Sequence, residues 1–97
     1  MTYRHVVLFR IHDEPSDTEV QDAVRALRTL GDEMDVTAWT VELSLDSRKG
    51  RIIVEDATFA DDAAFQGFRT HPAHIAVADR MARISDWWVG DYHARDN

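Results

Sequence analysis

The chain has 97 residues, which leaves room for one domain spanning residues 1–97. Hydrophobic residues make up 44% and charged residues 30% of it, which is typical of a globular protein and excludes disordered, collagenous and membrane-spanning classes. A net charge of −7 argues against nucleic acid and anionic membranes as partners, and the absence of cysteine excludes disulfides, thiolate nucleophiles and zinc–thiolate sites.

The chain begins with a predicted strand and a predicted helix. Tyr3–Ile11 is rich in β-branched and aromatic residues and ends at a polar loop, which predicts a strand with apolar side chains on both faces. Apolar residues recur at helical spacings over Ser16–Leu30, and Ser16 and Glu19 form a capping box. We expect Gly31 to serve as the C-terminal cap of this helix.

A β-hairpin and a second helical region are expected next. Asp35–Leu45 alternates apolar and polar side chains, and the polar turn 46–50 leads into a second strand over Arg51–Phe59. Asp61 and Asp62 then favour a helix start, because aspartates stabilise the N-terminal end of a helix.

The second helical region is expected to be broken before the last strand. Pro72 disfavours a helical residue before it but suits the first turn of a new helix, which continues over Ala73–Ile84. Ser85–His93 reads as the last strand, with Trp87 and Trp88 pointing to opposite faces. Tryptophans in strands are more often core or interface residues than parts of a ligand site.

The order of these elements is β-α-β-β-α-β, which predicts an α+β protein of the ferredoxin-like kind. Its four-stranded antiparallel sheet would have strand order 4-1-3-2, with both helical regions on one face. The other face is left bare and is expected to carry apolar side chains. We therefore expect a homodimer in which two sheets pack face to face and form a dimeric α+β barrel.

The candidate chemistry lies in histidines and one carboxylate. His71 and His74 flank the helix break, but two histidines three residues apart are too few for a metal site, so no metal is expected. His5 and Asp91 fall on neighbouring antiparallel strands, and if the odd residues of the first strand face the helices, both converge with His74 on one pocket. A neutral imidazole held there in one tautomer would be a general base. The alternative is that each histidine is a cap, a turn residue or a half-buried edge residue.

Four segments together resemble one known family. They are Arg4–Phe9, Phe59–Phe65, His71–His74 and Val89–Tyr92, which span essentially the whole chain. In combination they resemble the stress-responsive α/β barrel domain (Dabb) proteins, within the dimeric α+β barrel superfamily. The resemblance implies a ferredoxin-like protomer and a dimeric barrel.

The resemblance also implies site residues. The family includes olivetolic acid cyclase, a plant enzyme that closes a linear polyketide by aldol condensation without a cofactor. Carried over by position, the resemblance to this enzyme implies that His74 is the base and that His5 and Asp91 belong to the catalytic site. The candidate ligand-binding residues are His71, Phe68 and Phe65. The cyclase has a tyrosine where this chain has Phe68, so a hydroxyl that could polarise a carbonyl is missing.

Two functional hypotheses follow. The first is a small homodimer whose His/Asp pocket takes a small, partly apolar ligand and carries out acid/base chemistry without a cofactor. The second is a non-enzymatic stress-response or interaction protein with structural histidines. A cytoplasmic location is expected, because the apolar run Val6–Phe9 is too short for a signal peptide and is bracketed by Arg4 and Arg10.

Overall fold

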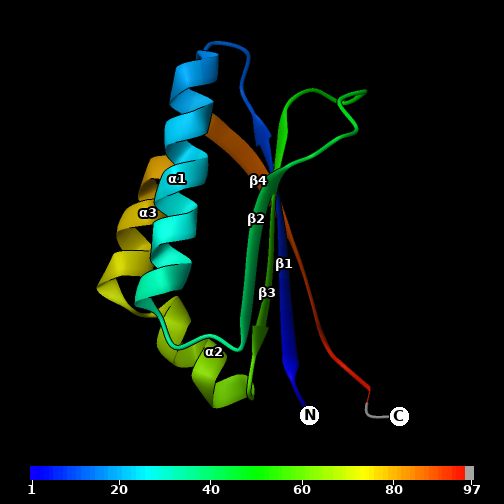
Figure 1. The fold of residues 1–97 in the computed structure, drawn as a ribbon, viewed down its shortest axis with the longest axis vertical. Coiled ribbons are helices and arrows are strands. Elements are labelled where there is room, and N and C mark those ends of the chain that lie inside the picture. The colour runs from blue at the N-terminus through cyan, green and yellow to red at the C-terminus, as the bar shows by residue number, and fades with distance from the viewer. Residues whose placement is uncertain (96–97) are drawn as a thin grey trace.

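The structure, a computed structural model, describes residues 1–95 (Figure 1). Its elements in chain order are β1 (Tyr3–Ile11), α1 (Asp17–Glu33), β2 (Ala38–Leu43), β3 (Ile52–Phe59), α2 (Asp62–Arg69), α3 (Pro72–Ile84) and β4 (Ser85–His93). Residues 96–97, the end of the expected single domain, lie outside the described residues. None of the helices within 1–95 is long and apolar enough to cross a membrane.

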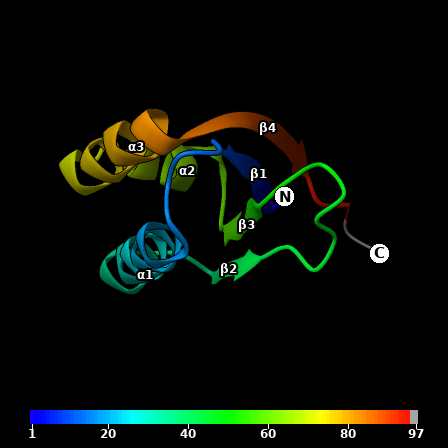
Figure 2. The same ribbon diagram turned by 90° about the horizontal axis from the view of Figure 1, so that it is seen from above.

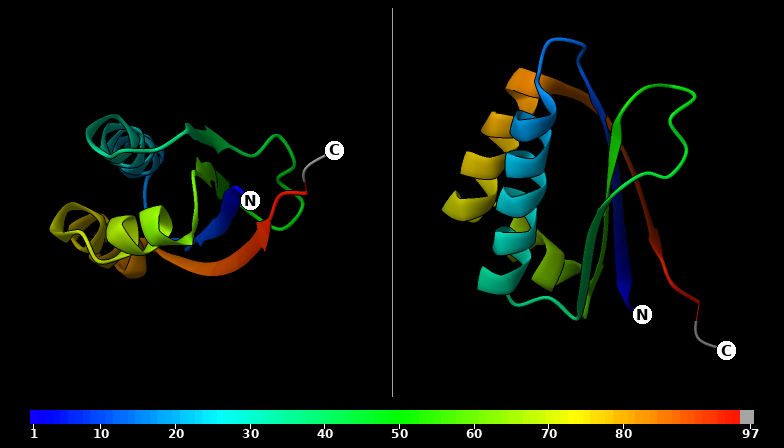
Figure 3. Two further views of the ribbon diagram at one scale, coloured as in Figure 1. Left: turned by 90° about the horizontal axis from the view of Figure 1, so that it is seen from below. Right: turned by 45° about the horizontal axis from the view of Figure 1, so that its top comes forward.

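The four strands form one antiparallel sheet in the order β2-β3-β1-β4. This order confirms the predicted ferredoxin-like topology. All three helices lie on one side of the sheet (Figures 1 and 2), and the view from below shows the same separation (Figure 3). β1 lies between β3 and β4, so its side chains can reach groups from both neighbours.

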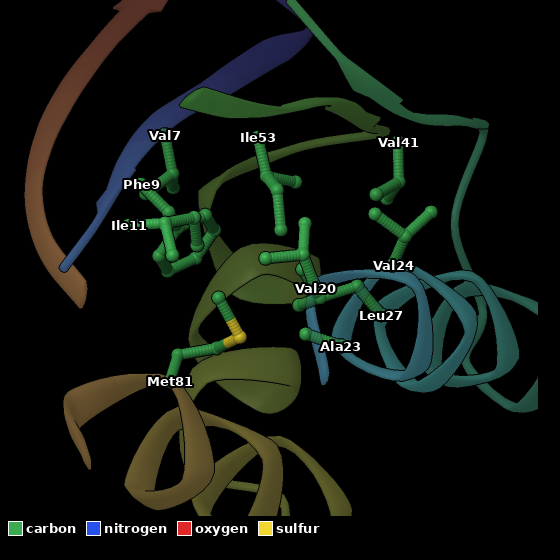
Figure 4. Packing of buried hydrophobic residues seen from close by; sticks show 10 residues of the cluster. All are labelled: Val7, Phe9, Ile11, Val20, Ala23, Val24, Leu27, Val41, Ile53 and Met81. Carbon is green, nitrogen blue, oxygen red and sulfur yellow. The ribbon is translucent and has the colours of Figure 1, made fainter. Parts of the chain in front are cut away.

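The main core forms between the helices and the face of the sheet that they cover. The odd residues of β1 from His5 to Ile11 are buried, so this parity faces the helices, as the pocket hypothesis required. Figure 4 shows the packed side chains, which come from the sheet and from two helices: Val7, Phe9, Ile11, Val41 and Ile53 from strands, Val20, Ala23, Val24 and Leu27 from α1, and Met81 from α3. The other parity of β1 is half-buried or exposed, and only Val6 and Leu8 on it are apolar.

The prediction that Gly31 ends the first helix was wrong. α1 continues to Glu33, and Gly31 is buried inside it. The indole of Trp39 lies directly on Gly31, so a Cβ at this position would be 2.1 Å from Trp39 Cδ1. The same indole donates a hydrogen bond from Nε1 to the carbonyl of Leu27 at 3.0 Å. Gly31 is therefore required for helix-to-strand packing rather than for helix termination.

The first arm of the hairpin is shorter than predicted. β2 spans only Ala38–Leu43, and Leu45 is fully exposed in the loop that follows. Gly50 in this loop has φ of 99°, a conformation that favours glycine. The polar residues of the turn take the chain away from the sheet before the expected end of the strand.

The second helical region is broken where predicted. Asp61 caps α2 by accepting a hydrogen bond from the Ala64 amide at 2.8 Å. α2 ends at Arg69, and Pro72 is the first residue of α3. The break separates α2, which packs on β3, from α3, which packs on β4, and the cavity described below lies between these helices and the sheet.

The other side of the sheet, which we call the open face, is not covered by any helix among the described residues. Leu8 and Trp88 are directly opposite each other on β1 and β4 and are 42% and 61% exposed. Arg4 forms an ion pair with Asp56, and its guanidinium lies 5.8 Å from the ring centre of Tyr92. The open face thus combines exposed aromatic and aliphatic groups, as predicted for the bare side of the sheet.

Candidate functional site

A cavity of about 470 Å³ lies between the helix-facing side of β1 and β4 and the helices α2 and α3. Its walls are mostly apolar and include Val7, Phe9, Leu27, Leu30, Val77, Ala78, Met81, Trp87 and Val89. Its polar lining residues are Tyr3, His5, Glu55, Gln66, Arg69, His74 and Asp91. A hollow of this size with a few polar groups is typical of a small-molecule site.

His5 and Asp91 meet as the strand positions predicted. They are directly opposite each other in the β1–β4 ladder, and His5 Nδ1 lies 2.8 Å from Asp91 Oδ1. Because the carboxylate can only accept, Nδ1 carries a proton and donates it. Strand order and parity alone were therefore sufficient to bring this pair together.

Glu55 is a third member of this cluster that sequence reasoning missed. It lies on β3, is only 3% exposed, and places Oε2 3.3 Å from His5 Nε2. A signal was available, because Glu55 has the same parity as Ile53 and Ala57 and interrupts the apolar face of its strand. A buried carboxylate without a partner is strongly unfavourable, so an acidic residue on that face indicates a buried cation.

The two carboxylates fix the protonation of His5. Burial alone would lower the pKa of His5, but the hydrogen bonds and charges of Glu55 and Asp91 outweigh it and raise the pKa above its ordinary value. Nδ1 donates its proton to Asp91, and Nε2 faces the Glu55 carboxylate at 3.3 Å. Because both nitrogens are paired with carboxylates and the raised pKa favours the protonated ring, His5 is poorly suited to act as a base.

Tyr3 joins the cluster through the second oxygen of Asp91. Its hydroxyl donates to Asp91 Oδ2 at 2.6 Å, and its ring stacks on Phe65 with centroids 4.3 Å apart. Burial, the hydrogen bond to Asp91 and the charge of that carboxylate raise the pKa of Tyr3 to about 12. Tyr3 therefore stays protonated and places in the cavity a hydroxyl that the sequence analysis did not select.

His74 is held differently from His5. Its Nδ1 lies 2.9 Å from the backbone carbonyl oxygen of Arg69 at the end of α2. A carbonyl only accepts, so Nδ1 is the protonated nitrogen and Nε2 of the neutral ring keeps its lone pair. His74 lines the cavity, so the geometry gives it the tautomer that a general base needs.

Phe65 and Phe68 lie close to His5 and His74 in the cavity, whereas His71 lies outside it. Phe65 and Phe68 both line the cavity, and the Phe68 ring centroid is 6.1 Å from that of His5 and 4.5 Å from that of His74. His71 is exposed and is not among the lining residues. It caps α3, where its Nδ1 accepts from the Ala73 amide at 3.0 Å. Five of the six predicted site residues therefore surround one cavity.

The cavity also has cationic and amide groups at its exposed side. Arg69 and Gln66 line it from α2, and both are exposed to solvent. Within residues 1–95, no group of three or more His, Asp and Glu side chains is arranged to hold a metal ion. His5 contacts the two carboxylates directly, Asp91 through a hydrogen bond at 2.8 Å and Glu55 at 3.3 Å.

Comparison with known proteins gives one family match over almost the whole chain. The model of the Stress responsive A/B Barrel Domain, Dabb, matches residues 3–94. The uncharacterized protein SCO4036 of Streptomyces coelicolor is 30% identical over 93 residues, which cover 92% of this chain and 96% of that protein.

Solved structures share the fold at lower identity. A dimeric ferredoxin-like protein of unknown function from Thermobifida fusca matches with a TM-score of 0.86 and 21% identity, covering 97% of this chain and 92% of that one. The hydroxynitrile lyase of Passiflora edulis also matches with a TM-score of 0.86, at 18% identity, covering 99% of this chain and 95% of the lyase.

Proposed function

Because the chain belongs to the stress responsive A/B barrel (Dabb) family, we propose that it acts as a small cytoplasmic homodimer. Its cavity binds a small, partly apolar, carbonyl-bearing molecule and transfers a proton on that molecule without a cofactor. The observation that carries this proposal is the arrangement of His74 in a largely apolar cavity, with its Nδ1 proton donated to the Arg69 carbonyl.

His74 is the base in this proposal. Its Nε2 removes a proton from the carbon next to the carbonyl, the C–H bond breaks, and the electron pair moves onto the carbonyl oxygen to give an enolate. The hydrogen bond from Nδ1 to Arg69 keeps the ring oriented and stabilises the positive charge that the ring gains. Proton return from His74 to carbon or to oxygen completes the transfer.

The enolate oxygen needs donors or positive charge, and Phe68 has no hydroxyl to supply them. Arg69 and Gln66 are the donors that line the exposed side of the cavity, so we assign the carbonyl oxygen to their end. His5 and Asp91 are positioning residues in this scheme, because they hold Tyr3 and shape the polar end of the cavity through the contacts at 2.8 and 2.6 Å. A protein with the same fold, the hydroxynitrile lyase of Passiflora edulis, is an enzyme, which supports this proposal.

The homodimer is proposed to form through the open face. Leu8, Trp88 and Tyr92 are exposed there, and large aromatic residues are enriched in the centres of interfaces. The Thermobifida fusca protein with the same fold is described as dimeric. The cavity lies on the opposite side of the sheet, so pairing through the open face leaves it accessible.

Hydrogen exchange on a simple aryl ketone tests the catalytic part of the proposal. Acetophenone is incubated with the protein in D₂O, and loss of its methyl proton signal is followed by NMR. We expect exchange faster than in buffer alone, and we expect His74→Gln to lower the protein-dependent rate by about 100-fold or more, since a positioned general base contributes roughly 10²–10⁴-fold.

The matched control is His12→Gln, which removes a histidine that does not line the cavity and contacts Asp86 at 3.3 Å. It should exchange at the wild-type rate. If the wild-type protein does not exceed the buffer rate, or if both variants behave alike, the enzymatic proposal fails. That result would favour the alternative of an interaction protein with structural histidines, for which the complete pairing of His5 by two carboxylates is the supporting observation.

A further inference from the structure

The hydrogen bonds already made around the cavity determine what its polar end can offer to a ligand. A tyrosine hydroxyl and a neutral imidazole each have one proton to donate. Tyr3 donates its proton to Asp91 Oδ2 at 2.6 Å, and His74 donates its proton to the Arg69 carbonyl at 2.9 Å. What remains on Tyr3 Oη and His74 Nε2 is a lone pair, so both groups face a ligand as acceptors.

The buried cluster behind Tyr3 adds no donor. His5 Nδ1 donates to Asp91 at 2.8 Å, and its Nε2 faces the Glu55 carboxylate at 3.3 Å. Glu55 and Asp91 are carboxylates, which accept only. Glu55 pairs with Nε2 of His5 inside the cluster, so this nitrogen is not offered to a ligand.

Three donor side chains line the cavity: Arg69 and Gln66 on α2, which are exposed, and the indole N–H of Trp87 on β4, which is 43% exposed. The buried part of the wall is formed by apolar groups such as Phe9 and Met81. A ligand that fills this space covers the Tyr3 oxygen. If the covering group is a hydrogen-bond donor, the oxygen gains a partner; if it is not, the oxygen loses contact with water and stays unpaired. Leaving a buried polar group without its partner carries a substantial penalty.

We infer that the cavity selects an apolar ring compound that donates a hydrogen bond, a phenol or an enol, and that its hydroxyl binds Tyr3 Oη while His74 Nε2 remains free for the reaction. This inference rests on the proposed function, because it concerns the ligand of the same cavity. Asp91 determines the selectivity, since it accepts the hydrogen bond from the Tyr3 hydroxyl and so leaves the tyrosine oxygen to act as an acceptor. His5 and Glu55 act by keeping Asp91 in place.

Three ligands of similar shape test the inference by NMR titration of the purified protein. 4-Propylphenol donates a hydrogen bond, 1-fluoro-4-propylbenzene has no donor and nearly the same size, and 4-propylanisole can only accept. We expect the phenol to bind about tenfold more tightly than the fluoro compound, the ratio that corresponds to one hydrogen bond of ordinary net strength. Shifts should be centred on amides near Tyr3 and Trp87.

Asp91→Asn should alter this preference. Its amide oxygen accepts from His5, its NH₂ group donates to Tyr3 Oη, and the Tyr3 hydroxyl proton becomes available to the ligand. We expect the ratio of phenol to fluoro affinity to fall towards one and 4-propylanisole to bind more tightly than it does to the wild type. If this variant does not fold, the ratio measured on the wild-type protein decides the question alone.

The outcomes separate the two proposals. Equal affinity of the wild type for the phenol and the fluoro compound overturns this inference and leaves the proposed proton transfer standing. Failure of all three compounds to bind at millimolar concentration overturns both, since the cavity would then not be a site for small apolar molecules. A phenol preference that is unchanged in folded Asp91→Asn also contradicts the role assigned to Tyr3.

Discussion

At the scale of single residues, Glu55 controls the protonation of His5. The ring lies between Glu55 and Asp91, and their combined charge raises its pKa despite burial. Glu55→Gln removes one charge and keeps the size of the side chain, so we expect the pKa of His5 to fall. NMR titration of the imidazole protons measures this, with Glu42→Gln as a control because Glu42 is exposed and pairs with Arg28.

The same shift makes folding stability depend on pH. The folded state binds the His5 proton more tightly than the unfolded chain does, so the stabilisation is complete below the ordinary histidine pKa of about 6.5 and is lost as the pH rises through the folded-state pKa. Urea unfolding at a series of pH values measures the free energy of unfolding. As the pH rises above about 6.5, this free energy should decline less in Glu55→Gln than in the wild type. An identical decline in both proteins would mean that Glu55 does not stabilise the imidazolium.

The sequence predicted the approach of His5 to Asp91, because strand order and side-chain parity determine which residues are opposite each other. It did not predict the pairing of His5 with Glu55. Glu55 is opposite Val7 and reaches His5 diagonally, and that contact depends on the β1–β3 register and on the side-chain direction. The sequence also did not predict that the Tyr3 oxygen can only accept a further hydrogen bond. This property follows from the hydrogen bond that Tyr3 donates to Asp91 and not from the residue type.

At the scale of elements, the order, the helix break and the topology followed from composition and spacing, whereas the end of α1 and both ends of β2 did not. Gly31 was expected to end α1 because glycine commonly follows the last turn of a helix. The helix instead continues to Glu33, and the absence of a side chain at Gly31 leaves room for the indole of Trp39 of β2. Such a contact between helix and strand carries no local signal, so only the three-dimensional structure distinguishes it from a cap.

Two glycines in helices should therefore respond in opposite directions to alanine. Gly31→Ala places a Cβ 2.1 Å from the Trp39 ring and should destabilise the protein by about 1–3 kcal/mol, the usual cost of overpacking. A Cβ at Gly67 of α2 would have no neighbour within 4 Å, so Gly67→Ala should stabilise by roughly 0.5–1 kcal/mol through its helix propensity.

Chemical denaturation of both variants, with tryptophan fluorescence as a second signal, measures these effects. The indole of Trp39 must move in Gly31→Ala, which should also weaken its 3.0 Å hydrogen bond to Leu27 and change the contribution of this tryptophan to the emission. Loss of stability in both variants, or in neither, would show that the contact with Trp39 is not what requires glycine at position 31.

At the scale of the whole molecule, β4 links the cavity to the open face. It is an edge strand that pairs only with β1. Trp87 and Asp91 line the cavity from one side of it, and Trp88 lies on the other side, 61% exposed. A second copy that packs on the open face would bury this surface and hold the edge strand in place, whereas the cavity lies on the other side of the sheet.

Trp88→Lys separates assembly from the cavity. A charge at the centre of a sheet-to-sheet interface should raise the dimer dissociation constant by about 30-fold or more, the effect of losing an interface residue worth roughly 2 kcal/mol. Sedimentation velocity at micromolar concentration should then show a monomer, and 4-propylphenol should still bind, because Trp88 does not line the cavity. Leu45→Lys is the control, since Leu45 is fully exposed in a loop away from the strands. A wild-type protein that sediments as a folded monomer at this concentration would contradict the dimer, and the open face would then need another explanation for its exposed tryptophan.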